Sequence, residues 1–425
     1  MEELKDKKLL ILGGNILSCD IVRAAKEEGA YTIVTDWNDP HVSPAKLISD
    51  EYWNISLMDY DELNKKIVQT GVKGIITGFT DSYLLPYQHL CELNGFPCYA
   101  TKEQFEWTLD KAAFKAKCKQ YGVSVVPEYS LKDFDPQTIT KTNRVIIKPV
   151  DNSGSRGICL CDNPEDFQKM LTRSLEFSEK KQVVIERYMD CDDVSFEYTV
   201  QNGEVTLSAI CDRYIYKTKE TGSVTSKLIY PSKYLQEYLK GTDEKVRRMF
   251  HEEGLQNGVL FMQAFVENGH FYFYEMGYRL SGGRHYIFTE KENKRNAAKE
   301  LVRFALTGSM SPERLADKIN PAFNDICCQL SLLGKSERIA RIRGVDLIEA
   351  MPEVLDASCY YSIGDEIGKQ GTTAQIFARI HIAAESQENL YKIVSKIKET
   401  LIVENEIGNN IIIDNDKIPE RQTDD

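Results

Sequence analysis

The chain has 425 residues, enough for two or three domains of about 150 residues each. It is 42% hydrophobic and 28% charged, which is typical of a soluble globular protein. The formal net charge of −12 argues against nucleic acid or an anionic membrane as a partner, because both favour a basic face. No apolar run is long enough to span a bilayer, and the first residues, MEELKDKK, lack the apolar core of a signal peptide. The eleven cysteines form no CxxC motif, so we expect reduced, mostly buried thiols in a cytoplasmic protein.

The N-terminal part alternates predicted strands and helices. Lys8–Gly14 predicts a strand that runs into a glycine turn, and the helix that follows ends at Gly29. Further strands are predicted at Tyr31–Asp36, Tyr52–Ser56 and Gly74–Gly78, with helical segments between them. This alternation predicts a parallel sheet with helices on its faces.

The first glycine turn could suit a dinucleotide. Gly13 and Gly14 sit at the turn, and Asp36 follows about 20 residues later, where an acid would hold a ribose. However, the residues after Gly14 are Asn, Ile and Leu, so the GxGxxG motif is absent. A Rossmann-like sheet without a dinucleotide is the favoured interpretation, and an NAD-dependent oxidoreductase is the weaker one, which a failure to bind NADH would exclude.

The next segment predicts one long helix or a helix pair, followed by a small antiparallel sheet. Phe105–Gly122 predicts one long helix or a helix pair, and Ser124–Tyr129 predicts an edge strand because it carries a proline. Val145–Lys148 and Gly157–Cys161 predict antiparallel strands that flank a loop. Asn163–Leu175 predicts a helix, with asparagine as its cap and proline at its first position.

The loop between those two strands is rich in glycine and serine. Successive backbone N–H groups in such a loop form a concavity that binds anions, and a lysine at the end of the first strand would add a phosphate clamp. The GxxxxGK[ST] pattern is absent, so this is not a Walker A loop. The alternative is a hairpin with a solvated lysine and a loop of turn-forming residues. The candidate phosphate-binding residues are Lys148, Ser153, Gly154, Ser155 and Gly157.

A buried strand and a hairpin follow. Val183–Met189 predicts an apolar strand that presents Glu186, which should have a partner because a bare buried carboxylate is costly. Val194–Val200 and Val205–Asp212 predict a hairpin around an Asn-Gly turn. Arg213–Leu228 is polar and predicts a mobile loop.

A second hairpin ends in a cluster of charges and glycines. Val259–Glu267 and His270–Met276 are its predicted strands, again around Asn-Gly. The following stretch, EMGYRLSGGRH, places Glu275, Arg279 and Arg284 among three glycines. Charges of both signs at a strand end indicate a ligand site, and the alternative is an ordinary surface ion-pair cluster.

The remaining chain predicts further helices and a small α+β unit at the C-terminus without recognisable chemistry, followed by a polar tail after Ile413. The predicted helices are Ser232–Gly254, Asn293–Leu306 and Gln387–Leu401, and the predicted strands are Ala340–Ile348, Cys359–Ser362 and Thr373–Ala383.

These features occur in an order that resembles the ATP-grasp ligases, which include biotin carboxylase, carbamoyl phosphate synthetase, D-alanine–D-alanine ligase and the L-amino-acid ligases. The segments LDKAAFKAKCKQYGVSVVPEY and EMGYRLSGG carry the resemblance, which covers roughly the whole chain. It implies an α/β fold: a Rossmann-like pre-ATP-grasp domain at 1–104, a two-part ATP-grasp domain at 105–310 with a lid at about 124–190, and a small α+β C-terminal domain at 311–425.

The resemblance also implies that ATP and Mg²⁺ are bound. The implied ATP ligands, from the phosphates to the adenine and the ribose, are Lys111 and Lys148, the loop 151–157, Glu186, the main chain of Arg187 and Met189, and Asp193. Glu275 would hold Mg²⁺ together with Gln263, whose amide oxygen can also bind this cation, and Arg279 would act with Lys148 on the transferring phosphate.

Two positions depart from the family pattern. Gln263 stands where the family usually has an acid, and Gly277 stands where it usually has asparagine. The favoured hypothesis is a ligase that joins a small-molecule carboxylate to an amine through an acyl phosphate, giving ADP and phosphate. The alternative is a nucleotide-binding protein with little turnover. Lys217, Gly283 and Arg284 are candidate substrate contacts, and the resemblance implies a homodimer.

Overall fold

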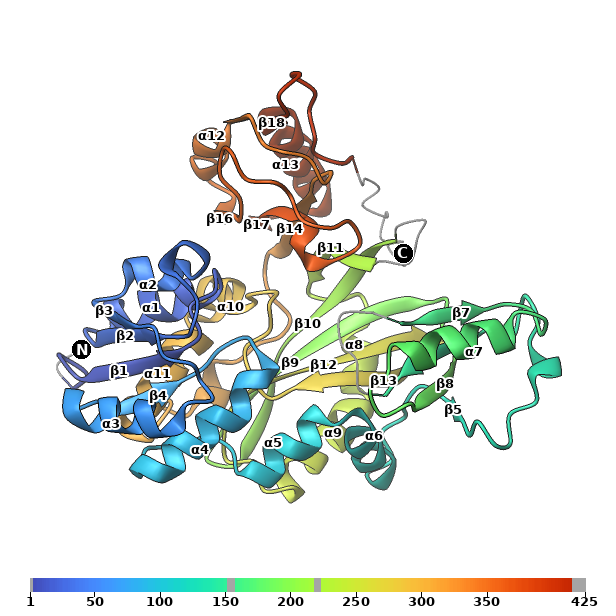
Figure 1. The fold of residues 1–425 in the computed structure, drawn as a ribbon, viewed down its shortest axis with the longest axis horizontal. Coiled ribbons are helices and arrows are strands. Elements are labelled where there is room, and N and C mark those ends of the chain that lie inside the picture. The colour runs from blue at the N-terminus through green and yellow to red at the C-terminus, as the bar shows by residue number, and fades with distance from the viewer. Residues whose placement is uncertain (1–2, 151–156, 218–222, 415–425) are drawn as a thin grey trace.

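The computed structural model in Figure 1 describes residues 3–150, 157–217 and 223–414. A parallel sheet lies near the N-terminus, a large antiparallel sheet crosses the middle of the molecule, and a small antiparallel sheet lies beyond it (Figure 1). The predicted loop residues Ser153, Gly154 and Ser155 lie outside the described residues, as does the tail from residue 415.

The N-terminal sheet has the order β3-β2-β1-β4, and its neighbouring strands are parallel, as the alternating pattern predicts. Its strands are β1 (Lys8–Leu12), β2 (Tyr31–Thr35), β3 (Glu51–Trp53) and β4 (Gly74–Ile76). The helices around it are α1 (Ser18–Glu27), α2 (Pro44–Ile48), α3 (Tyr60–Thr70) and α4 (Leu84–Asn94).

Asp36, the acid that a dinucleotide ribose would need, is buried and engaged within this sheet's own loops. Its carboxylate accepts hydrogen bonds from the Gly14 amide at 2.8 Å and from the Ser43 hydroxyl at 2.6 Å, and it pairs with Lys46 at 2.8 Å. These contacts support the interpretation that the sheet is Rossmann-like without a dinucleotide.

Two helices connect the N-terminal sheet to the small sheet. They are α5 (Lys102–Leu109) and α6 (Lys111–Gln120), so the helix-pair alternative is correct. The break is at Asp110, which has extended backbone angles and caps α6 by accepting a hydrogen bond from the Ala113 amide at 2.8 Å. The cap places Lys111 at the first position of α6.

The small sheet has the order β5-β8-β6-β7 and is antiparallel, with a helix that closes its apolar core. The prediction that strands β6 and β7 flank the glycine loop is confirmed, and β5 lies at an edge as predicted. The elements are β5 (Glu128–Tyr129), β6 (Val145–Pro149), β7 (Cys159–Cys161), α7 (Phe167–Glu176) and β8 (Val183–Arg187).

The large sheet has the order β13-β12-β9-β10-β11-β14-β17-β16, with antiparallel neighbours throughout. Both predicted Asn-Gly hairpins are confirmed, since both residues of each turn have positive φ. Its strands are β9 (Asp192–Gln201), β10 (Glu204–Lys217), β11 (Ser223–Tyr230), β12 (Asn257–Glu267), β13 (His270–Gly277), β14 (Ile326–Leu333), β16 (Val354–Cys359) and β17 (Ile376–Ala384).

Some local predictions are wrong. The predicted strand Ala340–Ile348 holds the short strand β15 (Arg341–Arg343) and then helix α12 (Val345–Glu349), and the predicted strand Cys359–Ser362 overlaps β16 (Val354–Cys359) at Cys359 alone. Arg213–Leu228 is largely strand, because β10 and β11 pair from Asp212–Ile229 out to Lys217–Ser223. Helix α7 begins at Phe167 and not at Pro164, because Asn163 caps a separate turn by accepting a hydrogen bond from the Asp166 amide at 2.9 Å.

The remaining helices cover the large sheet and extend to the N-terminal sheet, where α11 packs on α1 and β4. They are α8 (Leu235–Leu239), α9 (Thr242–Glu252), α10 (Tyr286–Asn293), α11 (Ala297–Thr307), α12 (Val345–Glu349) and α13 (Gln387–Thr400). The predicted helix at Asn293–Leu306 is thus the end of α10 and most of α11. Two short strands, β15 (Arg341–Arg343) and β18 (Ile402–Glu404), form a separate pair.

None of the helices in residues 3–150, 157–217 and 223–414 is long and apolar enough to cross a membrane. All eleven cysteines lie among the described residues as free thiols, and most are buried, as predicted.

Candidate functional site

The candidate site is built on one face of strand β9. Successive side chains of a strand point to opposite faces, and the residues at even positions pack on the helices behind the sheet, as in the contact of Phe196 with Tyr238 at 4.2 Å between ring centroids. The residues at odd positions, including Asp193, Ser195 and Glu197, therefore share the other face. Strand pairing places Gln263 of β12 beside Ser195, and Glu275 of β13 directly opposite Gln263.

Glu186 and two lysines lie between the small sheet and α6. The Lys115 ammonium is 2.5 Å from one Glu186 oxygen and 2.5 Å from Glu128, and Lys148 pairs with the other Glu186 oxygen. Burial alone would raise the pKa of Glu186, but the charges of Lys148 and Lys115 outweigh it and hold the pKa below its ordinary value. The prediction that Glu186 has a charged partner is confirmed.

Lys115 is a member of this cluster that sequence analysis missed. It lies one helical turn after Lys111 on the same helix and is buried, whereas Lys111 is exposed. Its position between the buried residues Phe114 and Cys118 was the available indication, because a lysine on the buried side of a helix needs an acid.

After β8, the backbone amide of Met189 is free of backbone hydrogen bonds among the described residues. The Arg187 amide donates to the Pro127 carbonyl at 3.0 Å, whereas the Met189 amide makes no backbone hydrogen bond within the described residues. The Arg187 side chain pairs with Glu267 of β12 at 2.7 Å and so ties the small sheet to the large one. Adenine contacts at these residues stay a prediction.

Asp193 is paired with an arginine that the sequence analysis placed in a loop. Arg213 of β10 lies opposite Asp193, and its guanidinium is 2.9 and 3.0 Å from the two carboxylate oxygens. Burial raises the pKa of Asp193, although Arg213 and the Tyr274 hydroxyl favour the charged form. Binding of ribose at Asp193 stays a prediction.

Glu275 is available to a ligand. Its half-buried carboxylate makes no hydrogen bond or ion pair with any of the residues that the structure describes. Within the same residues, no group of three or more acidic, histidine or cysteine side chains is arranged to hold a metal ion. Any cation at this end of the sheet would thus depend on Glu275 and on oxygens from a bound ligand or water.

Arg279 is held by an acid from the N-terminal part. Its guanidinium donates to the two Asp81 oxygens at 2.6 and 2.7 Å, and it lies over the Phe261 ring at 5.0 Å from the centroid. The same ring explains one departure from the family pattern, because a Cβ on Gly277 would lie 2.4 Å from a Phe261 ring carbon. Glycine at 277 leaves room for the ring that supports Arg279.

A buried polar group lies behind Arg279. Glu197 and His285 are 3.4 Å apart, and within the described part of the chain Glu197 Oε2, the Ser281 hydroxyl and His285 Nδ1 lack hydrogen-bond partners. Burial raises the pKa of Glu197 to about 8, although the charge of Arg279 favours the charged form. Burial, with the charge of Arg295, lowers the pKa of His285 to about 3.

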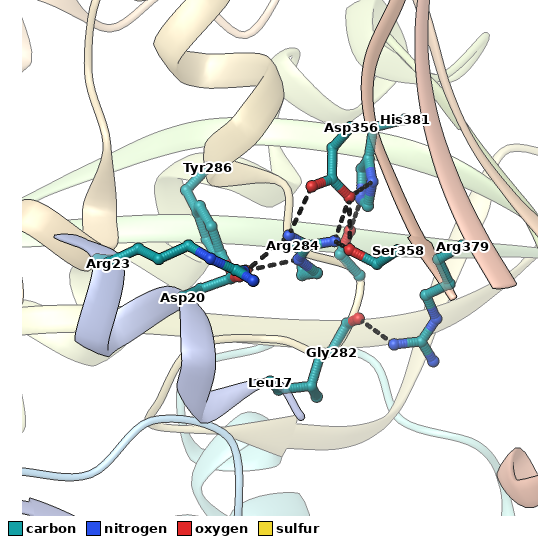
Figure 2. A network of polar contacts seen from close by, with 12 residues as sticks. Leu17, Asp20, Arg23, Gly282, Arg284, Tyr286, Asp356, Ser358, Arg379 and His381 are labelled. Carbon is teal, nitrogen blue, oxygen red and sulfur yellow. Dashed lines mark hydrogen bonds and ion pairs between the residues drawn. The ribbon is translucent and has the colours of Figure 1, made fainter. Parts of the chain in front are cut away.

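Arg284 joins three parts of the chain (Figure 2). It donates to Asp20 of α1 at 2.6 Å and to Asp356 of β16 at 2.5 Å, with Ser358 at 3.1 Å. Its φ of +55° is unusual for a residue other than glycine, and these charged contacts hold it there. Both carboxylates belong to the chain itself, so substrate binding at Arg284 stays a prediction.

The other candidate residues are near this region or at the hinge of the small sheet. The Gly283 carbonyl contacts the His381 ring nitrogen at 3.1 Å, and a Cβ at 283 would lie 2.6 Å from Leu228. Lys217 donates to the Tyr188 hydroxyl at 3.2 Å. Gly157 has φ +76°, and its missing Cβ leaves room for Phe177. Ligand binding at these residues stays a prediction.

The fold combines a small antiparallel sheet with a larger one, and the candidate residues lie on both sheets. Residues 142–285 match the family model of the ATP-grasp domain, so this part of the chain is an ATP-grasp domain. The resemblance drawn from the sequence is confirmed.

Known proteins of this superfamily are similar to the chain in sequence and structure. The 2-oxoglutarate carboxylase small subunit of Hydrogenobacter thermophilus is 26% identical over 203 residues, which are 43% of each protein. The L-amino acid ligase from Bacillus licheniformis has a TM-score of 0.77 at 16% identity, over 95% of this chain and 99% of that one. The biotin carboxylase domain of the Hydrogenobacter 2-oxoglutarate carboxylase has a TM-score of 0.75 at 19% identity, over 93% and 90%. The matches span less than half the length of the curated relatives.

Proposed function

We propose that the chain is an ATP-dependent ligase that joins a small-molecule carboxylate to an amine through an acyl phosphate. The observation that carries the proposal is the division of charges across one ATP-grasp site: Lys148 and Glu186 on the small sheet, and a Glu275 carboxylate without a partner among the described residues on the large sheet. Two similar structures support it, since one is an L-amino acid ligase and the other contains MgADP and bicarbonate.

The proposed reaction has two displacements. A carboxylate oxygen forms a bond to the γ-phosphorus of ATP, the bond from that phosphorus to the β–γ bridging oxygen breaks, and ADP leaves. The amine nitrogen then forms a bond to the acyl carbon, the bond from carbon to phosphate breaks, and the nitrogen loses a proton to water. Such a transfer needs positioning and charge neutralisation and does not require a side-chain nucleophile.

The chain's own residues supply that positioning. Lys111 at the start of α6 and Lys148 at the end of β6 would contact the phosphates, and the open Met189 amide would receive the adenine edge. Arg279 would exchange its contact with Asp81 for the transferring phosphate.

A magnesium ion fits at Glu275, because a half-buried carboxylate without a protein partner in the described residues offers the oxygen ligand that this hard cation prefers. Glu275 would hold Mg²⁺, whose charge neutralises the terminal phosphates when it is bound.

The assembly, the location and the domain limits are part of the proposal. The similar Hydrogenobacter structure is a dimer, which supports a homodimer here. Free, mostly buried cysteines support a cytoplasmic location. The domain boundaries near 104 and 310 are also proposed, with the lid on β5–β8. The separate N-terminal sheet supports the first boundary, and an apolar core made mostly of residues after 326 supports the second, although β14 continues the large sheet.

A second candidate function is nucleotide binding with little turnover. Gln263 favours it, because an amide directly opposite Glu275 leaves that pair of facing residues with one carboxylate. The two candidates differ in whether a substrate pair stimulates ADP release.

The test is ADP release from ATP and Mg²⁺ against amino acids and other small carboxylates, singly and in pairs. We expect one pair to stimulate the wild type and Lys148→Ala to abolish the stimulation. Lys169→Ala is the matched control, because it removes an exposed lysine from the outer helix of the small sheet. ATP binding that Lys148→Ala removes, without stimulation by any pair, would instead support the second candidate.

A further inference from the structure

Arg213 contacts several oxygens on the large sheet, in the part of the site that contains Gln263 and Glu275. Besides the two Asp193 oxygens, its guanidinium is 3.0 Å from Gln263 Oε1 and 3.2 Å from the Thr225 hydroxyl, and it also donates to the Tyr274 hydroxyl. The Arg213 side chain is 12% exposed, so these contacts are largely shielded from water. They join β9, β10, β11, β12 and β13.

The network also restrains Gln263. Its amide oxygen accepts from Arg213 and lies 3.0 Å from the Tyr274 hydroxyl, which is in turn 3.0 Å from Asp193. The Tyr274 hydroxyl has one proton, which it can donate either to Gln263 or to Asp193, so Arg213 is the donor that holds the Gln263 oxygen in both cases. Gln263 thus lacks the charge of an acid and also has its oxygen engaged.

The two carboxylates of this region, Asp193 and Glu275, differ in whether a cation of the chain already pairs with them. A second divalent cation needs anionic oxygens, and besides Glu275 the carboxylate that shares Arg213 with Gln263 is that of Asp193, which is paired with the guanidinium. Glu275 lies across the strand pair and keeps its charge available. The arrangement offers one carboxylate to a metal and a fixed guanidinium beside it.

We propose that Arg213 is a positioning residue that takes the place of a second divalent cation, so that the site binds nucleotide with a single metal ion at Glu275. This inference rests on the proposed ATP-binding function and adds the metal stoichiometry. The amide of Gln263 accepts a hydrogen bond from Arg213 without adding a charge, whereas an acid at 263 would form an ion pair with the guanidinium. The inference therefore explains glutamine at 263 and arginine at 213 together.

The test counts Mn²⁺ ions bound per ADP-bound protein, from the electron paramagnetic resonance signal of the free ion at saturating ADP. We expect a single Mn²⁺ for the wild type. The double variant Arg213→Gln/Gln263→Glu should gain a second Mn²⁺, because it frees two carboxylates beside Glu275.

Arg314→Gln is the matched control, since it removes a paired arginine near the opposite end of β10 and should leave one Mn²⁺. Two Mn²⁺ on the wild type, or a folded double variant that still binds one, would overturn the inference while leaving the ligase proposal intact. Failure of the wild type to bind ADP with Mn²⁺ would overturn both. The wild-type count decides the question even where the double variant does not fold.

Discussion

At the scale of single residues, the site depends on buried ionisable side chains whose partners come from other elements. Glu186 is charged because two lysines approach it, whereas Glu197, on the central strand, is fully buried and has no comparable partner. Nearby lysines therefore lower the pKa of one glutamate, whereas burial raises the pKa of the other. Burial sets the penalty, and the neighbouring cations decide whether it is overcome.

The raised pKa of Glu197 predicts a pH-dependent stability. The pKa changes from 4.5 when unfolded to about 8 when folded, so the favourable contribution is present below pH 4.5 and is lost as the pH rises through 8. Glu197→Gln should avoid that loss. Its free energy of unfolding relative to wild type should rise by about 3–5 kcal/mol between pH 4.5 and pH 8 and then level off.

Urea denaturation at pH 5, 7 and 9 measures this difference. Glu204→Gln is a suitable control, since that residue lies at the other end of the same hairpin in an exposed ion pair. A constant difference between Glu197→Gln and wild type across the three pH values would show that Glu197 ionises normally.

At the scale of elements, the β12–β13 hairpin positions the charged residues and also explains why glycine stands at 277. We predict that Gly277→Asn lowers the free energy of unfolding by about 1–3 kcal/mol, because its Cβ meets the Phe261 ring. In a Phe261→Ala background the same substitution should cost much less.

Thermal and urea unfolding of the single and double variants form a cycle that measures this coupling. Gly282→Ala is the control, because a Cβ there would have its nearest neighbours at 3.8 and 3.9 Å. Additive effects of the two substitutions would mean that the ring does not determine the choice at 277.

Local elements were predictable because their causes are local. The β-branched run of β6 and the two Asn-Gly turns specify backbone conformation within a few residues. The β10–β11 pair was missed, because its polar residues at 213–228 suggested a loop when they alternate across a strand. The join of β11 to β14 was also missed, since it pairs Tyr230 with Cys327 across a long separation in the chain.

The site was predicted only in part, for a related reason. Resemblance located Lys148, Glu186 and Glu275 at strand ends, and the structure brings Lys148 and Glu186 into contact. Lys115 and Arg213 acquire their significance from pairing across elements, which one sequence does not display.

At the scale of the whole molecule, Arg284 holds together the N-terminal helix α1 and strand β16 near the C-terminus (Figure 2). We predict that Arg284→Gln lowers the free energy of unfolding by about 3 kcal/mol, because it removes the buried guanidinium that two partly buried carboxylates share. Limited proteolysis should then release the C-terminal part earlier than in wild type.

Arg341→Gln provides the comparison, since Arg341 is exposed and pairs with Glu404, and its loss should cost about 1 kcal/mol or less. Equal effects of the two variants would indicate that the buried network contributes no more than a surface ion pair.

The Asp81 carboxylate would compete with an anionic substrate for the Arg279 guanidinium, because the two side chains already form an ion pair. Any phosphate or carboxylate that reaches this guanidinium must first displace a carboxylate of the chain, so one ion pair is exchanged for another. Binding there would be weaker than at an unpaired guanidinium, and we expect a more highly charged anion to compete better with Asp81. Since Asp81 belongs to the N-terminal part and Arg279 to the large sheet, each exchange would also loosen one contact between them.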